Sequence, residues 1–188
     1  IPGSSADVSF LAGMLVDKFH HHLPLYRQHQ RLAQAGVSLD RGTLTRQVHR
    51  VTQLLEPIYQ ALMSSVLQSP LLAIDETPTP AGLKKGAGKS KGQIDSGYFW
   101  AFYGSHDELF FLYSPSRARK VLDAVLEGFT GTLLTDGYSA YESFVNGHKG
   151  VLHAQCWSHS RRNFVYAEKA SPQQCADVLM IIQQIYSV

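Results

Sequence analysis

The chain has few cysteines, little net charge and no long apolar run, and each shortage argues against a class of protein. Two cysteines, Cys156 and Cys175, are too few for the disulfide framework of a small secreted domain and fit a reducing cytoplasm. No apolar stretch approaches the roughly 20 residues that a transmembrane helix needs. A formal net charge of +2 permits nucleic-acid binding without requiring it. The composition predicts a cytoplasmic globular protein with no membrane partner.

Neither end of the sequence carries the signals of a natural terminus. The start, Ile1-Pro2-Gly3-Ser4, has no methionine, basic segment or small-residue cleavage site, which argues against a signal peptide. Residues 176–186 form an apolar helical pattern that stops near Val188 without a capping glycine or proline. We therefore expect a fragment of a longer protein, with one main core and a helical attachment.

The first 68 residues have helical periodicity throughout. Apolar residues recur at helical spacing in residues 10–19 and 51–66, which predicts an all-helical region over residues 1–68. Between them, residues 36–48 resemble a helix-turn-helix, with Leu44 and Val48 inward and Arg46 outward, where it could contact DNA. An αα-hairpin that only packs within a small bundle explains the same pattern, so both interpretations stay open.

From residue 69 the pattern changes to short strands alternating with helices. The expected strands are residues 71–75, 98–103, 109–113, 133–136 and 151–154, and the expected helices are residues 116–127, 140–144 and 157 onward. Pro78 and Pro80 are expected to end the first strand, and a Lys/Gly/Ser loop should follow over residues 82–92. Aromatic residues on both faces of residues 98–103 predict a sheet covered on both sides. The order of elements predicts an α/β fold with a mixed sheet flanked by helices over residues 69–188.

Two of these strands end in a carboxylate. Asp75 follows one apolar run and Asp136 follows another. Mg²⁺ prefers hard oxygen ligands and is usually held by one or two carboxylates, so the pair indicates a metal site for phosphoryl transfer. Alternatively, Asp136 starts a turn and Asp75 caps a helix, since aspartate is common in both positions.

Six motifs occur in order along nearly the whole chain. They are His22-Leu23-Pro24-Leu25-Tyr26-Arg27-Gln28, Asp75-Glu76-Thr77-Pro78, Gly97-Tyr98-Phe99-Trp100, Ser114-Pro115-Ser116-Arg117, Thr135-Asp136-Gly137-Tyr138-Ser139-Ala140-Tyr141 and Cys156-Trp157-Ser158-His159-Ser160-Arg161-Arg162-Asn163-Phe164. Together they resemble bacterial transposases of the insertion-sequence-66 type, a branch of the DDE superfamily. The resemblance implies an RNase H-like catalytic domain, preceded here by the helical region.

The resemblance also implies an activity and its site. A DDE transposase cleaves and joins double-stranded DNA at insertion-sequence ends, as a homo-oligomer in the active complex, with Mg²⁺ for which Mn²⁺ substitutes. Asp75 corresponds to the first acid and Asp136 to the second. The third, a glutamate, is expected beyond Val188, so the fragment should be inactive alone. Two other functions stay open: a non-catalytic DNA-binding or assembly module of a mobile element, and an RNase H-like nuclease.

Several polar residues outside the acid pair are candidates for binding. Arg161 and Arg162 form a possible phosphate clamp with His159, although a solvated helix face explains them equally well. Lys89, in the Lys/Gly/Ser loop, could contact the DNA backbone. The spacing of His153, Cys156 and His159 is compatible with zinc. The alternative is that Cys156 packs in the core and His159 faces the active-site groove or DNA.

Overall fold

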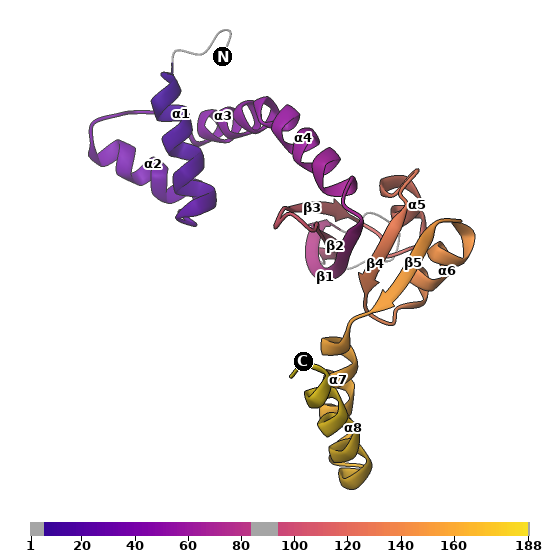
Figure 1. Ribbon diagram of the computed structural model, residues 1–188. Helices are drawn as coiled ribbons and strands as arrows, with labels where there is room; N and C mark the ends of the chain where they lie inside the picture. The colour runs from indigo at the N-terminus through magenta and orange to yellow at the C-terminus, as the bar shows by residue number, and fades with distance from the viewer. Residues whose placement is uncertain (1–5, 84–93, 188) are drawn as a thin grey trace, which may run out of the picture. The chain divides into compact units, whose positions relative to one another are not determined.

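The computed structural model describes residues 6–83 and 94–187 (Figure 1). They fall into two compact units, Ile1–Ala61 and Leu62–Val188. This division lies inside helix α4 (Glu56–Leu67), whereas the sequence places the boundary after residue 68. Within the described ranges, no helix is both long enough and apolar enough to cross a bilayer.

The first unit is helical, as predicted. It contains α1 (Val8–Leu15), the π-helix η1 (Val16–His20), α2 (Leu25–Gln34) and α3 (Arg41–Leu54), and it includes the start of α4. Its core is a cluster of Leu11, Met14, Leu44 and Val48. The Asp40 carboxylate caps α3 by accepting the backbone N–H of residue 43 at 3.0 Å. Packing of one apolar stripe from each helix therefore holds this unit together.

The turn between α2 and α3 is a Schellman motif. Gly36 has a φ of +81°, and the N–H of Val37 donates to the carbonyl of Leu32 at 2.9 Å. After this turn, Leu44 and Val48 are buried, as predicted for the inward face of α3. Helix-turn-helix and packing-only hairpin share this geometry, so DNA contact by α3 stays a prediction.

A buried glutamine explains the first motif. Gln28 of α2 is only 2% exposed, and its amide Nε2 donates to the carbonyl oxygens of Met14 at 3.3 Å and Leu23 at 3.1 Å. These carbonyls lie in α1 and in the connection before α2, where His22 has a positive φ of 53°. Gln28 therefore ties α2 to α1 and to the connection before α2 through two backbone carbonyl groups.

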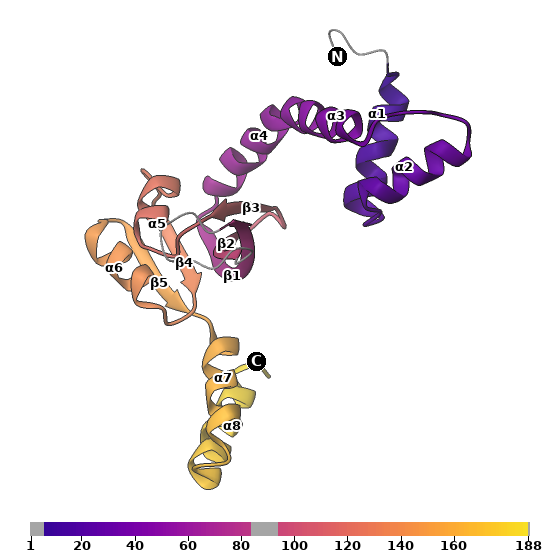
Figure 2. The same cartoon turned by 180° about the vertical axis from the view of Figure 1, so that it is seen from behind.

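The second unit is built on a five-stranded mixed sheet in the order β3-β2-β1-β4-β5 (Figures 1 and 2). The strands are β1 (Leu71–Leu83), β2 (Ile94–Tyr103), β3 (Leu109–Ser114), β4 (Gly131–Thr135) and β5 (Val151–Gln155). The first three pair antiparallel, and β4 and β5 are parallel to β1. This is the RNase H-like arrangement, so the predicted fold class is confirmed.

Strand β1 is longer than predicted. It continues through Asp75, Pro78 and Pro80, because β2 pairs with it without a shift as far as the Pro80–Ser96 pair and, after a register shift, at the Leu83–Ile94 pair. The registered pairing with β4 covers only residues 71–73. Beyond that point one edge of β1 has no registered strand partner, so the missing proline N–H groups remove no bond from a sheet interior. The expectation that the prolines end the strand is wrong, and Asp75 lies within β1.

The helices of the second unit also differ from the prediction in extent. They are α5 (Lys120–Val125), α6 (Ser139–Gly147), α7 (Trp157–Ala167) and α8 (Pro172–Ile185). Helix α5 is shorter than residues 116–127 and α6 is longer than residues 140–144. The predicted long helix from Trp157 is interrupted, and Pro172 starts α8 at the first helical position, where the missing N–H costs nothing.

The two faces of the sheet differ in burial. On the covered face, Leu72, Trp100, Phe102 and Leu133 are all 0% exposed, and the ring of Tyr141 from α6 packs edge-on against Trp100. On the open face, large apolar side chains are between 39% and 67% exposed, and they are Leu71, Phe99, Tyr103, Leu109, Phe111, Tyr113 and Leu152. The prediction of a sheet covered on both sides is therefore wrong for the described residues.

Candidate active site

In the parallel register of β1 and β4, Asp75 and Asp136 lie equally far along the chain from the last registered pair. The last registered pair is Ala73 with Leu134, and each aspartate lies two residues further along. Adjacent strands are about 4.8 Å apart, so both side chains start from neighbouring backbones. The strands that carry the two acids are neighbours, as the RNase H-like order predicts. Their role as metal ligands stays a prediction.

Each aspartate is oriented by a backbone amide through its Oδ1 atom. Asp75 accepts the N–H of Glu76 at 3.0 Å, and Asp136 accepts the N–H of Tyr138 at 2.9 Å. The Asp75 side chain is 58% exposed, whereas that of Asp136 is 23% exposed. Both carboxylates are thus accessible from solvent, and Asp136 is the more tightly enclosed.

The Oδ2 atoms face weaker contacts that a cation could replace. Asp136 Oδ2 lies 3.7 Å from Nη2 of Arg117, and Asp75 Oδ2 lies 4.0 Å from Nε2 of His159. These distances exceed those of good hydrogen bonds. Two hard oxygen donors suit Mg²⁺ or Mn²⁺. No group of three His, Cys, Asp or Glu side chains able to hold a metal occurs within residues 6–83 and 94–187. Each aspartate therefore offers one oxygen suited to a divalent ion, and their joint role as ligands stays a prediction.

A buried glutamate beside the pair was missed by sequence reasoning. The Glu76 side chain is 1% exposed, and its Oε1 and Oε2 atoms accept from Nε of Arg117 and the hydroxyl of Tyr141. Burial and the bond to Glu76 raise the pKa of the Tyr141 phenol far above its ordinary value. The motifs around residues 75, 117 and 136–141 thus meet in one hydrogen-bonded group, a convergence that their separate positions in sequence do not reveal.

The guanidinium of Arg117 is the centre of this group. It lies 3.8 Å from the ring centroid of Tyr138, in cation–π geometry, and it also faces Glu76 and Asp136. Burial lowers the pKa of Arg117, but the hydrogen bond to Glu76 and the charges of both acids raise it overall. Arg117 therefore stays charged between two carboxylates.

Cys156 and His159 lie on the Asp75 side of the site. With Asp75, Ala73 and Leu134 they help to line a pocket of about 180 Å³ on the open face. Burial raises the pKa of the Cys156 thiol, but hydrogen bonding with His159 and with backbone amides lowers it overall. His159 therefore faces the groove beside Asp75, and a direct contact with DNA stays a prediction.

The possible zinc ligands do not converge. His153 lies in β5 and its Nε2 atom is 2.9 Å from the hydroxyl of Thr135, on the covered face. Cys156 caps the start of α7 and His159 lies one turn later, toward Asp75. Since none of the described residues forms a three-ligand group, the geometry favours packing and hydrogen bonding over a zinc site.

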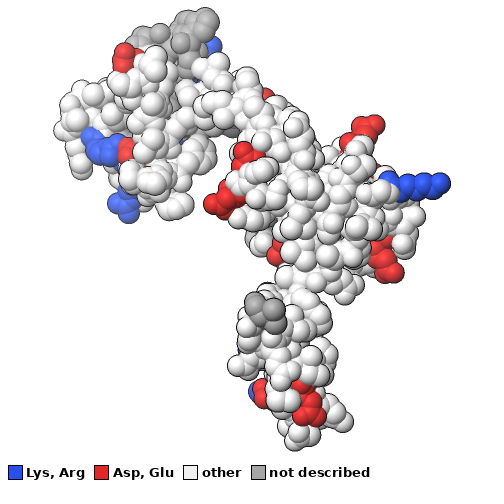
Figure 3. Space-filling view, in the orientation of Figure 1, with Lys and Arg blue, Asp and Glu red and all other residues white. Residues whose placement is uncertain are grey.

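The predicted DNA-contacting residues are distributed over different elements. Arg161 and Arg162 are exposed on α7, and Arg46 is exposed on α3 in the first unit. Lys89 lies outside the described residues. In the view of Figure 3, Lys and Arg side chains form separate small patches. Among the described residues, no single basic stripe identifies a DNA path on that face.

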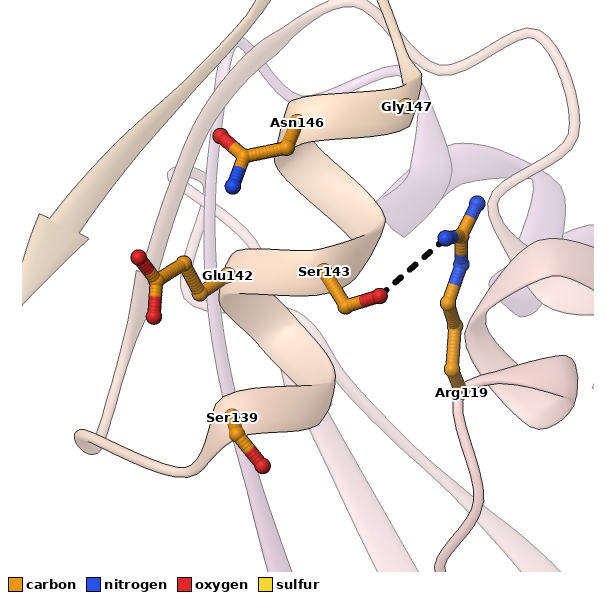
Figure 4. Close-up of a pocket in the computed structure, with 6 residues that line it drawn as sticks. All are labelled: Arg119, Ser139, Glu142, Ser143, Asn146 and Gly147. Carbon is orange, nitrogen blue, oxygen red and sulfur yellow. Dashed lines mark hydrogen bonds between the residues drawn. The ribbon is translucent and has the colours of Figure 1, made fainter.

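A separate polar hollow lies between α5 and α6 (Figure 4). It has a volume of about 480 Å³ and is lined by residues including Arg119, Ser143 and Gly147. Nη1 of Arg119 donates to the Ser143 hydroxyl at 3.1 Å, and its Nε pairs with Asp123 at 3.2 Å. Arg119 thus serves a surface helix contact, which makes it a matched control for Arg117.

The strand order and the packing of the helices define an RNase H-like domain. Residues 3–188 match the family described as "Transposase IS66 family", and the chain belongs to this family.

Similar proteins are longer than this chain. The uncharacterized protein y4jD of Sinorhizobium fredii (strain NBRC 101917 / NGR234) is 32% identical over 99% of this chain and 38% of its own length. The uncharacterized protein y4qI of the same strain is 28% identical over 82% of this chain and 30% of its own length. The chain therefore spans less than two fifths of these curated relatives.

Among solved structures, a chain of the "Mos1 transposase paired-end complex with left transposon end" is similar over 86% of this chain and 63% of its own. The identity is 9% and the TM-score is 0.33. This likeness is too weak to add to what the strand order shows.

Proposed function

We propose that this chain carries two of the acidic ligands of a divalent-metal site that cleaves and joins DNA at transposon ends. The observation that supports the proposal is the parallel β1–β4 register, whose last pair, Ala73 with Leu134, lies two residues before each aspartate. Family membership supports the reaction class. The enzyme would be a polynucleotidyl transferase acting on double-stranded DNA.

The proposed roles follow from the geometry of the two carboxylates. Asp75, the more exposed, would be the ligand that two divalent ions share, as in the two-metal sites of phosphoryl transfer, and Asp136 would be a ligand of one ion. A Mg²⁺ ion held by these carboxylates would supply Lewis-acid chemistry for the attack of water or a 3′-hydroxyl on the scissile phosphate. The chain's own contribution is orientation, because the amides of Glu76 and Tyr138 hold one oxygen of each acid and leave the other for the ion.

The third acid is proposed to lie in the part of the full-length transposase that this chain does not cover. Two observations support this location. No third ligand joins the pair among residues 6–83 and 94–187, and the chain spans only 38% of its relative y4jD. A glutamate supplied from that part would complete the coordination.

We expect the 188-residue chain to bind Mn²⁺ weakly, in the millimolar range, through this pair, since an ion with two carboxylates keeps most of its waters. Titration followed by electron paramagnetic resonance measures the loss of the free Mn²⁺ signal. Asp75→Asn or Asp136→Asn should each weaken binding by about tenfold or more. Asp123→Asn on α5 is the matched control and should leave the affinity unchanged. Equal binding by all four proteins would contradict the proposed site.

Contacts with DNA are proposed to be electrostatic and hardly sequence-specific, because the net charge is only +2. Replacing both Arg161 and Arg162 by Ala should weaken duplex binding and reduce the magnitude of the salt slope by up to about 1.8. Fluorescence anisotropy at several salt concentrations measures both quantities. Arg119→Ala serves as the control and should change neither.

The same measurement tests the alternative functions. Affinity that stays constant across salt concentrations would indicate base readout by the helical unit and favour a DNA-binding or assembly module. Metal-dependent cutting of DNA without any joining, by a longer chain, would instead favour an RNase H-like nuclease.

A further inference from the structure

The Arg117 side chain links a buried carboxylate to one of the proposed ligands. Its Nε donates to Glu76, whose side chain is 1% exposed, while its Nη2 lies 3.7 Å from Oδ2 of Asp136. We propose that Arg117 is a positioning residue that fixes the Asp136 carboxylate for metal binding. This inference rests on the proposed metal site for its consequence, although the positioning itself can be measured without metal.

Arg117 is held rigidly from three sides. Glu76 binds its Nε and is itself fixed by the hydroxyl of Tyr141. The ring of Tyr138 lies under the guanidinium at 3.8 Å, and the hydroxyl of Tyr138 donates to the backbone carbonyl of Arg117 at 3.4 Å. A planar guanidinium with several donors can serve two acids at once, which a lysine ammonium cannot do with the same geometry.

The turn that presents Arg117 is built by serines of the same motif. Ser114 Oγ accepts the N–H of Ser116 at 3.1 Å, and Ser116 Oγ accepts the N–H of Ala118 at 3.1 Å. Such bonds replace regular secondary structure between β3 and α5 and give the backbone around Arg117 a defined path. The motif at residues 114–117 therefore acts at the acid pair, although it lies far from both acids in sequence.

Asp136 receives one contact on each carboxylate oxygen. The N–H of Tyr138 binds Oδ1 at 2.9 Å, and Arg117 faces Oδ2. Asp136 is the first residue after β4, where no further registered pair fixes its side chain. Losing the Arg117 side chain would remove the charged group that faces Oδ2 and leave the Tyr138 N–H as the contact that orients the carboxylate. An outer contact of this kind typically affects metal affinity by about 10-fold to 100-fold.

The charge of Arg117 must be separated from its positioning effect. Removing the guanidinium alone would leave Glu76 buried without its charge partner. It would also remove a positive charge that repels a bound cation. The paired replacement Glu76→Gln with Arg117→Gln removes one negative and one positive charge together, so the net charge is unchanged. Arg117→Lys keeps the charge but loses the forked geometry. Arg119→Gln, two residues along the chain, is the control.

Two measurements on the 188-residue chain test the proposal. In the metal-free protein, hydrogen exchange of the Tyr138 amide reports on its bond to Asp136. In the Mn²⁺ titration, the affinity reports on how well the Asp136 carboxylate is oriented for metal binding. We expect the paired variant and Arg117→Lys to show several-fold faster Tyr138 exchange and about tenfold weaker Mn²⁺ binding. Arg119→Gln should match the wild-type chain in both measurements.

The outcomes separate this inference from the proposed function. Wild-type exchange and wild-type affinity in the paired variant would overturn the positioning role and leave Arg117 as a charge partner of Glu76 alone. Faster Tyr138 exchange in a protein whose wild type binds no Mn²⁺ would support positioning but contradict the metal site. Faster exchange with unchanged Mn²⁺ affinity would overturn the claimed consequence for metal binding.

Discussion

Asp75→Asn or Asp136→Asn should abolish DNA cleavage by a longer transposase chain that contains this sequence. The reason is that either change removes a carboxylate that, in the proposed site, would hold Mg²⁺ where charge develops in the transition state. A loss of several kcal/mol of stabilisation lowers the rate by about three orders of magnitude or more. The assay follows a labelled transposon-end duplex with Mg²⁺ or Mn²⁺, and Asp123→Asn controls for removal of a surface carboxylate.

The 188-residue chain provides the second arm of this experiment. We expect it to cut and join no DNA even with both aspartates present, because the third acid is proposed to lie outside it. If this chain cleaves DNA strongly and the cleavage survives Asp75→Asn, two claims would be overturned. They are the location of the third acid outside the chain and the role of Asp75 in the active site. If the chain cleaves DNA and Asp75→Asn removes that cleavage, only the proposed location of the third acid outside the chain would be overturned.

Arg117→Ala should lower the free energy of unfolding of the second unit by about 3 kcal/mol. Glu76 would keep its place between the sheet and α6, with the Tyr141 hydroxyl as its remaining partner, and a buried carboxylate without a compensating charge is costly. Denaturant unfolding followed by tryptophan fluorescence measures the change, since the Trp100 side chain is fully buried in this unit.

The control variants identify the cause of that loss. Adding Glu76→Gln to Arg117→Ala should restore a large part of the stability, because a neutral amide needs no counter-charge. Arg119→Ala should change the stability by less than about 0.5 kcal/mol, since its pair with Asp123 is a surface pair on one helix. If Arg117→Ala were as stable as Arg119→Ala, Glu76 would draw its compensation from elsewhere.

The existence of the strands could be predicted from sequence because short apolar runs and hairpin signals depend on local chemistry, and their order was expected from the resemblance to the RNase H-like fold. Leu72 and Leu133 are each 0% exposed, as their place in the two apolar runs implies. Periodicity does not, however, locate the end of a strand. Strand β1 runs past Pro78 because the available pairing, and not the proline, sets its length.

The open sheet face was also beyond sequence reasoning. Phe99 and Tyr103 alternate with Trp100 and Phe102, and all four are typical of a core. The two sets nevertheless have opposite environments, since Trp100 and Phe102 are 0% exposed while Phe99 is 46% and Tyr103 is 44% exposed. Which face of a strand is covered depends on where later helices pack, and residue type does not encode that placement.

The sequence by itself determined the fold class and the family, because both depend on residue type and order along the chain, and it also proposed the two aspartates as ligands. Only the tertiary structure decided that Glu76 is buried and that Arg117 and Tyr141 bind it beside Asp136. These residues come from three separate motifs. Their contacts exist because strand pairing and the packing of α6 bring distant segments within hydrogen-bonding range, and such distances are a property of the folded chain alone.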